Sequence, residues 1–127
     1  MSTPGTSRPV GPYSPVLAAG GWVVTSGQIG LATGPDGQPA LVAGGTLAEL
    51  RQALANLASV LASAGATLDD VVKTTLFLVD MGEFAAVNAV WVEVFDQHRP
   101  TRSAIGVAAL PLGARVEVEA WAHVPGR

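Results

Sequence analysis

A stripe of leucines in the middle of the chain places the strongest constraint on its fold. The stripe follows Thr46-Leu-Ala-Glu49, a spacing in which the threonine and glutamate side chains can each satisfy a free amide at a helix start. We therefore predict a helix from Thr46 to about Gly65, with one apolar face that packs against another layer. That face carries Leu47, Leu50, Leu54, Leu57 and Leu61.

A strand and a second helix follow this segment. Residues Val71 to Val79 are rich in β-branched and aromatic side chains, with apolar groups at both parities, which predicts a strand covered on both faces. The first helix can provide one cover and a second subunit the other. Asp80-Met-Gly-Glu83 repeats the capping pattern, and the apolar residues behind it have helical spacing. The second helix is therefore predicted from Phe84 to about His98.

The chain is predicted to open with a hairpin. Its apolar stretches Val16 to Ala19 and Trp22 to Ile29 are joined by Gly20-Gly21, and a glycine pair supplies the positive φ angles of a two-residue turn. After a segment dense in turn residues, Ala40 to Val42 predicts one more short strand.

Two further strands are predicted to close the chain, from Arg102 to Leu110 and from Arg115 to Val124, with Pro111-Leu-Gly113 as the turn between them. The whole order predicts one α+β domain over residues 1–127, in which residues 1–9 form a flexible segment. Its two helices are expected to pack on one face of a mixed six-stranded sheet. The other sheet face would need a partner.

Composition supports this need for a partner. Charged residues make up 13% of the chain against about 25% in an average soluble protein, so other subunits are expected to cover part of the surface. A net charge of -3 with no basic stripe argues against nonspecific nucleic-acid binding. The chain has no cysteine, its two histidines lack metal-ligand spacing, and we expect no metal. No stretch has the character of a signal peptide or membrane span, so we expect a cytoplasmic protein.

Four segments mix small, turn-forming and polar residues where the surrounding pattern is apolar. They are Gly11-Pro-Tyr-Ser14, Thr25-Ser-Gly-Gln-Ile29, Pro100-Thr-Arg-Ser-Ala104 and Val116-Glu-Val-Glu119. Together with Asp69-Asp-Val-Val-Lys-Thr-Thr and Phe84-Ala-Ala-Val-Asn88, this ordered set resembles the RidA/YjgF family of reactive intermediate deaminases. The similarity extends from about Val10 to Ala122.

The resemblance implies a chorismate-mutase-like fold and a homotrimer whose sheets form a central β-barrel, with three active sites between subunits. It implies hydrolysis of reactive imines and enamines, such as 2-iminopropanoate and 2-aminoacrylate, to 2-keto acids and ammonia. These substrates are released by pyridoxal-phosphate dehydratases, which gives the protein a functional link to those enzymes. The resemblance implies no cofactor and no metal.

Two charged residues are the first candidates for this chemistry. A guanidinium fork can make two parallel hydrogen bonds to a carboxylate, and Arg102 matches the family's carboxylate-binding arginine. Glu119 is placed by the resemblance at the family's water-positioning glutamate, in preference to Glu117, which is read as a polar residue on a solvent face. The two can share a sheet face within one hairpin only if the pairing register allows it, and the sequence leaves that register open.

The resemblance adds three residues near the N-terminus. Tyr13 matches the family's active-site tyrosine, although a half-buried structural tyrosine is the alternative. Ser26 and Gly27 can offer a hydroxyl and a closely approaching backbone amide to the substrate carboxylate, because glycine has no β-carbon in the way. The alternative for these two residues is a simple bulge in the strand.

The remaining candidates lie around the second helix and the Arg102 segment. Asn88 can reach an interface or remain a solvated helix residue, and Ser103 and Ala104 are placed in the substrate-binding segment. This chain departs from the family at Pro15, where glutamine is frequent, and at Gly106, where many members have glutamate. Alanine at 104 replaces the cysteine of some members and excludes thiol chemistry there. These departures concern substrate preference more than the reaction.

Two other functions remain open at this level. A noncatalytic protein that binds small carboxylates in the same clefts would use Arg102 but would not need Glu119. Ribonuclease activity, known for some relatives, is disfavoured because the chain is acidic and lacks a basic or aromatic binding track.

Overall fold

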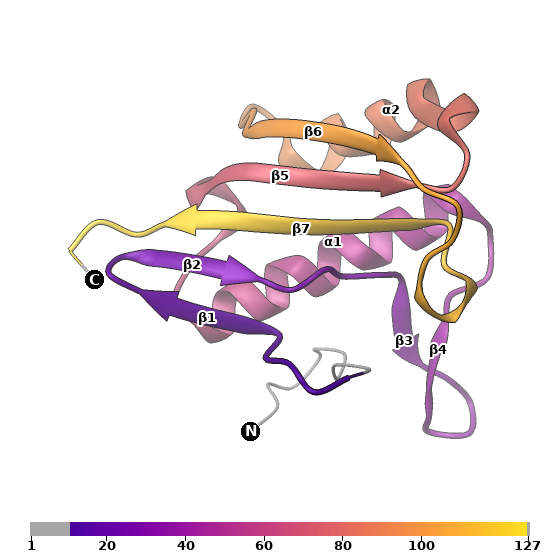
Figure 1. The fold of residues 1–127 in the computed structure, drawn as a ribbon, viewed down its shortest axis with the longest axis horizontal. Coiled ribbons are helices and arrows are strands. Elements are labelled where there is room, and N and C mark those ends of the chain that lie inside the picture. Colours follow the sequence, from indigo (N-terminus) through magenta and orange to yellow (C-terminus); the bar gives the residue numbers. More distant parts are fainter. Residues whose placement is uncertain (1–10, 127) are drawn as a thin grey trace.

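A mixed sheet of five strands forms one layer of the molecule, and two helices form the other (Figure 1). The computed structural model describes residues 11–126, so the predicted flexible segment 1–9 lies outside the described residues. The strands are β1 (Val16–Ala19), β2 (Trp22–Thr25), β3 (Leu31–Thr33), β4 (Pro39–Leu41), β5 (Val71–Leu78), β6 (Thr101–Gly106) and β7 (Val116–His123). The helices are α1 (Thr46–Ser63) and α2 (Phe84–Phe95), with short 3₁₀ turns η1 (Leu68–Asp70), η2 (Met81–Glu83) and η3 (Pro111–Gly113). The predicted α+β class is confirmed.

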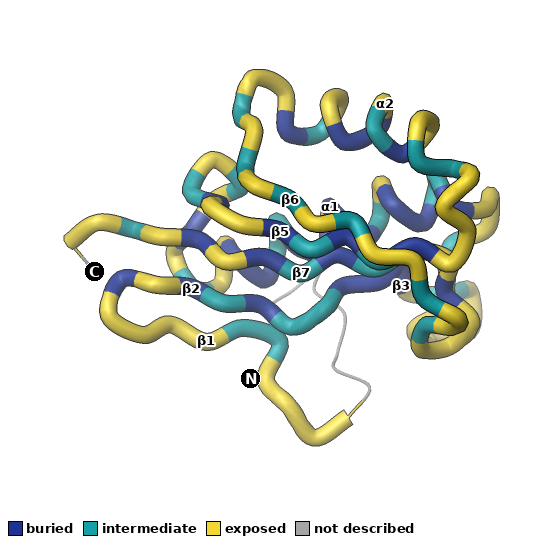
Figure 2. Tube along the Cα trace, turned by 45° about the horizontal axis from the view of Figure 1, so that its top comes forward, coloured by how far each residue is buried: buried dark blue, intermediate teal, exposed yellow. Residues whose placement is uncertain are grey.

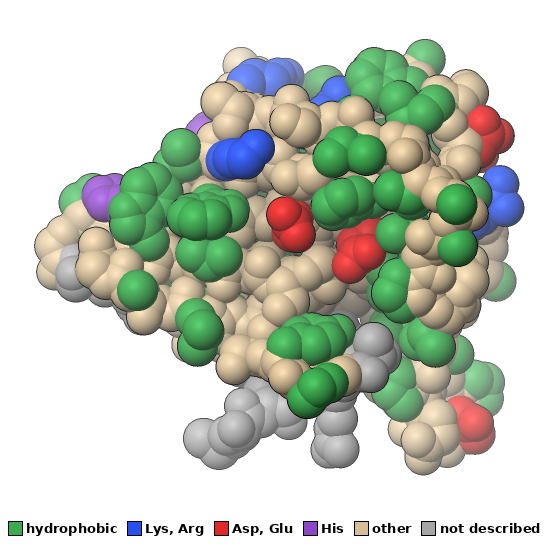
Figure 3. All heavy atoms as spheres, viewed as in Figure 1, with side chains coloured by type: hydrophobic (Ala, Val, Ile, Leu, Met, Phe, Trp, Pro, Cys, Tyr) green, Lys and Arg blue, Asp and Glu red, His purple; other side chains and the backbone are tan. Residues whose placement is uncertain are grey.

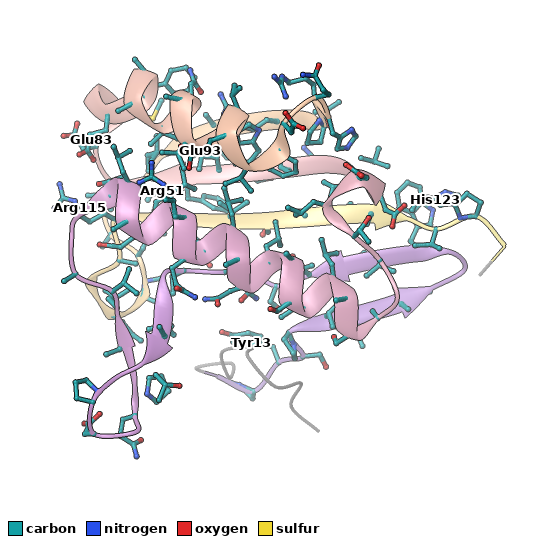
Figure 4. All side chains as sticks on the ribbon, turned by 180° about the vertical axis from the view of Figure 1, so that it is seen from behind. Tyr13, Arg51, Glu83, Glu93, Arg115 and His123 are labelled. Carbon is teal, nitrogen blue, oxygen red and sulfur yellow. The ribbon has the colours of Figure 1, made fainter. Side chains whose placement is uncertain are left out.

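Both helices pack on the same face of the sheet, and the core lies between the two layers (Figure 2). In α1 the predicted leucine stripe forms this face, because four of its five leucines have no exposed surface and Leu47 is partly buried. Helix α2 contributes Val87 and Phe95 to the same core. An ion pair between Arg51 of α1 and Glu93 of α2, 3.0 Å from Nε to Oε2, joins the helices at their surface (Figure 4).

The N-terminal hairpin forms as its glycine pair predicts. Strands β1 and β2 pair antiparallel, and Gly20 and Gly21 at the turn have φ angles of 55° and 87°. Positive φ at both central residues is the geometry that glycine adopts without a steric penalty.

The predicted six-stranded sheet is wrong: the main sheet has five strands, in the order β1-β2-β7-β5-β6, and β3 and β4 pair only with each other. The chain leaves the sheet after Gln28, the last residue before β3 that pairs with β7, and α1 holds the segment that follows. Gly30 packs so closely on Glu49 of α1 that an added β-carbon would lie 2.7 Å from its Cα. Asn56 of α1 donates to the carbonyl oxygens of Ile29 and Leu31, at 3.1 and 2.9 Å.

This anchoring makes Asn56 a test of the fold. Its side chain is 2% exposed and supplies two hydrogen bonds to buried backbone. We expect Asn56→Ala to lower the free energy of unfolding by about 1–3 kcal/mol, because buried acceptors lose their donor. Urea denaturation measures this loss. Gln52→Ala is the control, because Gln52 only donates to the Oδ1 atom of Asn56. Equal losses in the two variants would contradict the anchoring role.

The predicted hairpin of the last two strands is also wrong. Strand β6 pairs in parallel with β5, and β7 pairs antiparallel with β5 and β2, so β5 separates β6 from β7. The crossover through α2 makes β5 and β6 parallel. Strand β6 also ends at Gly106, earlier than the predicted Leu110.

The predicted capping box at the start of α1 does not form. Gly45 occupies the N-cap position, and no side chain caps the helix. The Thr46 hydroxyl instead donates to Oε2 of Glu83 at 2.5 Å, and Oε1 of Glu49 accepts from the backbone amide of Arg115 at 2.9 Å. Figure 4 shows Glu83 and Arg115 together at this end of the molecule. Long-range partners therefore replace the local cap and join α1 to the start of β7.

Candidate active site

Arg102 lies on the helix-facing side of β6, beside fully buried Thr74 of β5. The Cζ atom of its guanidinium lies 5.3 Å from the ring centre of Phe84 and 4.9 Å from that of Trp91. One nitrogen, Nη2, donates to the Oδ1 atom of Asn88 at 2.7 Å. Burial lowers the pKa of Arg102 from its usual value, although a guanidinium remains protonated at neutral pH. The structure thus brings two predicted site residues, Arg102 and Asn88, into contact.

On the other face of the sheet, the carboxylate of Glu117 lies against Gly27. A β-carbon built on Gly27 would be 1.9 Å from Oε2 of Glu117, so the carboxylate occupies the space that a side chain would fill. Burial raises the pKa of Glu117, and the nearby charge of Glu119 raises it further. A carboxylate with a raised pKa is suited to accept and return a proton.

Gly27 lies in a β-bulge that follows strand β2. The pairing of the chain with β7 shifts by one residue between Val24 and Gln28, which places the extra residue at Ser26 and Gly27. The bulge and the site therefore coincide, although the sequence presented them as alternatives.

Ser26 also fastens the N-terminal segment to the bulge. Its hydroxyl donates to the carbonyl oxygen of Ser14 at 2.6 Å, and its amide donates to that of Pro15 at 2.9 Å. Tyr13 directly precedes Ser14 and Pro15, and its side chain is 46% exposed. The predicted residues Tyr13, Ser26 and Gly27 are thus held in one region together with Glu117.

The other predicted residues divide between the two faces. Ser103 and Glu119 both lie opposite Thr75 of β5, on the face away from the helices. Ala104 packs against the core. Arg102 and Glu119 therefore do not share a sheet face within one chain, because neighbouring residues of a strand point to opposite sides.

The candidate residues consequently form two half-sites, one cationic and one acidic. The cationic half-site consists of Arg102 and Asn88, and the acidic half-site of Ser26, Gly27 and Glu117. Strands β6 and β7 are two strand spacings apart, about 10 Å, and the side chains of Arg102 and Glu117 point to opposite faces. A small molecule cannot contact both within a single chain.

The acidic half-site lies on a face that no helix of this chain covers. Figure 3 shows acidic side chains in the middle of this face, with hydrophobic side chains around them. Exposed apolar residues on β1, β2 and β7 include Leu17, Trp22 and Trp121. An apolar surface of this kind on a sheet favours contact with another protein chain.

Two searches of the described residues, 11–126, were negative. They contain no cluster of three or more histidine, aspartate or glutamate side chains that could hold a metal ion. Within the same range, neither helix has the length and hydropathy needed to span a bilayer.

Sequence reasoning missed three contributors to these half-sites. Glu117 was read as solvated, because alternation along β7 places it on the same face as Glu119 and cannot choose between them. Phe84 and Trp91 were read only as the apolar stripe of α2. A pairing of both rings with Arg102 could not be predicted while β6 was expected to pair with β7.

The chain is therefore a small α+β domain, in which two helices cover one face of a five-stranded sheet and polar half-sites lie on opposite faces. The sequence profile of the Endoribonuclease L-PSP family matches residues 5–124, and the chain belongs to this family, which is also called RidA/YjgF.

Relatives with assigned names support this membership. The chain is 43% identical to the mouse protein 2-iminobutanoate/2-iminopropanoate deaminase over 122 residues, which cover 96% of this chain and 88% of that protein. It is 41% identical to a RutC family protein of a Synechocystis strain, over 98% of this chain and 95% of the relative. The crystal structure of RidA from an Antarctic Psychrobacter has a TM-score of 0.89 at 35% identity, and covers 97% of both chains. The structure of E. coli TdcF with bound serine has a TM-score of 0.84 at 34% identity, over 96% of this chain and 95% of that one.

Proposed function

We propose that this protein hydrolyses 2-imino acids and their enamine tautomers to 2-keto acids and ammonia. The observation that carries the proposal is the pair of half-sites, because the substrate needs a cation for its carboxylate and a base for the attacking water. The deaminase names of relatives about 41% identical to this chain support the same chemistry.

The cationic half-site binds the substrate in this mechanism. The guanidinium of Arg102 uses one Nη2 hydrogen on Asn88 and points its other donors at the substrate carboxylate. The amide of Gly27 lies in the acidic half-site and can bind the same carboxylate from the opposite side, whereas both donors of Ser26 are already bonded to backbone carbonyl oxygens. The imine carbon, next to the carboxylate, is then held in a fixed position for attack.

The acidic half-site performs the proton transfers. Glu117 accepts a proton from a water molecule as its oxygen attacks the carbon of the protonated imine, which gives a neutral carbinolamine. Glu117 then returns this proton to nitrogen, the carbon–nitrogen bond breaks as ammonia leaves, and the former water oxygen releases its remaining proton to Glu117 or to solvent, which gives the 2-keto acid. In this mechanism Tyr13 has the role that the family resemblance gives it, a hydrogen bond to the water or the substrate. The sequence resemblance favours Glu119 for this role, and we assign it to Glu117 because of its position against Gly27.

The separation of the half-sites leads us to propose sites shared between subunits of a homotrimer, in which the sheets face a central barrel. Arg102 and Asn88 would come from one subunit, and Tyr13, Ser26, Gly27 and Glu117 from its neighbour. The uncovered apolar sheet face supports such an assembly.

The function is tested by adding the protein to a threonine dehydratase that releases 2-iminobutanoate in place. We expect 2-oxobutanoate and ammonia to form faster than with buffer or with heat-denatured protein. An unchanged rate over a range of amino-acid substrates and their dehydratases would exclude the proposed activity.

An RNA substrate fits the described surface poorly. The open face has aromatic residues such as Trp22 and Trp121, but it carries Glu117 and Glu119 where a nucleic-acid groove would be lined by basic residues. We expect no salt-dependent mobility shift of single-stranded RNA at low protein concentration.

Gly27→Ala tests the close contact in the acidic half-site. The new methyl group would displace the flexible carboxylate of Glu117, while the backbone of Gly27 needs no positive φ. We expect turnover to fall about 10- to 100-fold, because a misplacement of about 1 Å at a catalytic group has effects of this size. Thermal unfolding should change little. Gly34→Ala, in the β3–β4 ribbon, is the control and should keep wild-type turnover.

Mixed oligomers test the sharing of sites between subunits. Arg102→Lys and Glu117→Gln chains, each inactive alone, are coexpressed with different tags and the mixed species are purified. If each site takes one half from each of two neighbouring chains, every purified mixed trimer has both wild-type residues in one of its three sites, which gives about a third of wild-type activity. Recovery of activity to that level is expected. No recovery in mixed oligomers would mean that both residues act within one chain.

A further inference from the structure

The guanidinium of Arg102 is held by one stripe of α2. Its three contacts come from Phe84, Asn88 and Trp91, which are spaced by four and three residues and therefore lie on one helix face. Two of the contacts are aromatic ring faces and only one is a hydrogen bond. The described residues give no hydrogen-bond partner to Nε or Nη1 of Arg102, so these donors are available to a ligand.

Trp91 is the more rigid of the two rings. Its side chain is 5% exposed, whereas Phe84 is only partly buried. The indole ring of Trp91 also packs against Phe95, with the ring centres 4.8 Å apart. The ring beneath Arg102 is thus fixed by the core and cannot rotate away without a cavity.

An aromatic face under a guanidinium has a directional effect. The ring attracts the cation and orients its plane, which leaves only the edge of the fork to meet a carboxylate. The ring also excludes water from one face of the guanidinium, so its hydrogen bonds to a bound anion compete with less solvent. The hydrogen bond that Arg102 donates to Asn88 would by itself leave the guanidinium free to rotate about that contact.

We propose that Trp91 is a positioning residue, which sets the affinity of this site for substrate carboxylates by fixing the plane of Arg102. This inference rests on the proposed function, in which Arg102 binds the carboxylate. Trp91 itself touches no substrate atom. It acts through Arg102, with Phe84 as the second and more mobile support.

The test compares Trp91→Leu with Trp91→Phe. Leucine fills much of the volume but has no ring face, whereas phenylalanine keeps one. We expect Trp91→Leu to raise KM for 2-iminobutanoate and the Kd for 2-oxobutanoate about tenfold, with kcat within about threefold of wild type, because the lost contact is ground-state binding. Trp91→Phe should restore most of the affinity. Calorimetry with 2-oxobutanoate gives the Kd without any turnover.

A matched core variant separates positioning from stability. Val90 of α2 is 2% exposed and no contact joins it to Arg102. Val90→Ala should therefore lower the melting temperature and leave the Kd for 2-oxobutanoate unchanged. If Trp91→Leu does not fold, Phe84→Leu takes its place, with a smaller rise in Kd expected.

The outcomes are distinct. A wild-type Kd in a folded Trp91→Leu protein overturns the inference and leaves the proposed function intact. If Trp91→Leu does not fold, a wild-type Kd in Phe84→Leu overturns it instead, because ring support of Arg102 would then have no effect on affinity. An equal loss of affinity in Val90→Ala overturns it as well, because general loosening of α2 would then explain the effect. Wild-type protein that binds 2-oxobutanoate through Arg102 but does not hydrolyse imines refutes the proposed function alone.

Discussion

Replacing Arg102 with lysine should reduce kcat/KM for 2-iminobutanoate by about 100-fold or more, although the charge is kept. An ammonium group cannot make two parallel hydrogen bonds to a carboxylate, and it lacks the flat face that packs on Phe84 and Trp91. The loss should include a higher Kd for 2-oxobutanoate, measured by calorimetry, because the interaction is made with substrate and product alike. The fold should survive, since lysine can place its stem along the same apolar surface.

The control for this variant is another arginine of the same segment. Arg99 donates to the backbone carbonyl oxygens of Asp96 and His98 at an exposed turn, away from Asn88. Arg99→Lys should turn over 2-iminobutanoate at the wild-type rate. Comparable activity in Arg102→Lys and Arg99→Lys would exclude Arg102 as the carboxylate anchor.

The second large effect is expected from Glu117→Gln, which should lower kcat about 100-fold or more with little change in the Kd for 2-oxobutanoate. Glutamine keeps the size and shape of the side chain but cannot accept the proton of the attacking water. Glu119→Gln should retain kcat within a few-fold. Initial rates of the two variants under saturating imine supply therefore show which glutamate acts as the base.

The pH dependence of turnover is a second way to distinguish Glu117 from Glu119 as the base. Glu117 is active as a base only when ionised, and burial together with the charge of Glu119 raises its pKa. Activity should therefore rise with pH through that raised pKa. Removing the neighbouring charge in Glu119→Gln lowers the pKa of Glu117 and moves the acidic limb of the profile to lower pH. A loss of kcat in Glu119→Gln with full activity in Glu117→Gln would reverse the assignment.

If Glu117→Gln and Glu119→Gln both matched wild-type turnover, neither carboxylate would have a role in hydrolysis. If the wild-type protein bound 2-oxobutanoate but hydrolysed imine no faster than buffer, it would be a carboxylate-binding member of its family and not an enzyme.

The elements of the fold follow from patterns that are local in sequence. The leucine stripe of α1, the glycine pair between β1 and β2, and the alternation along β7 each specify one element and its buried face. Strand order depends on contacts between distant segments, and for that reason it was predicted less well. The sequence does not show that β5 lies between β6 and β7, nor that Asn56 holds the β3 segment away from the sheet.

The candidate residues were predicted from the family resemblance, and their grouping was not. Alternation along one strand places Glu117 and Glu119 on the same face, so only the approach of Gly27 separates them. The sequence left open whether Arg102 could meet Glu119 within one hairpin, and in the structure its partners are two rings and an amide of α2. These contacts cross the fold and leave no periodic signal in the sequence.

The position of β7 has a consequence for synthesis of the chain. Strand β7 is the last element, and it lies in the middle of the sheet, between β2 and β5. Until it leaves the ribosome, the β1–β2 hairpin and the β5–β6 pair have no strand to join them, and the apolar face of α1 has no complete sheet to cover. We therefore expect the sheet to form only after β7 has been synthesised, when these long-range contacts become possible. The strand that completes the sheet also carries Glu117, so a chain that stops short of β7 lacks the middle of its sheet and the carboxylate that we propose as the base.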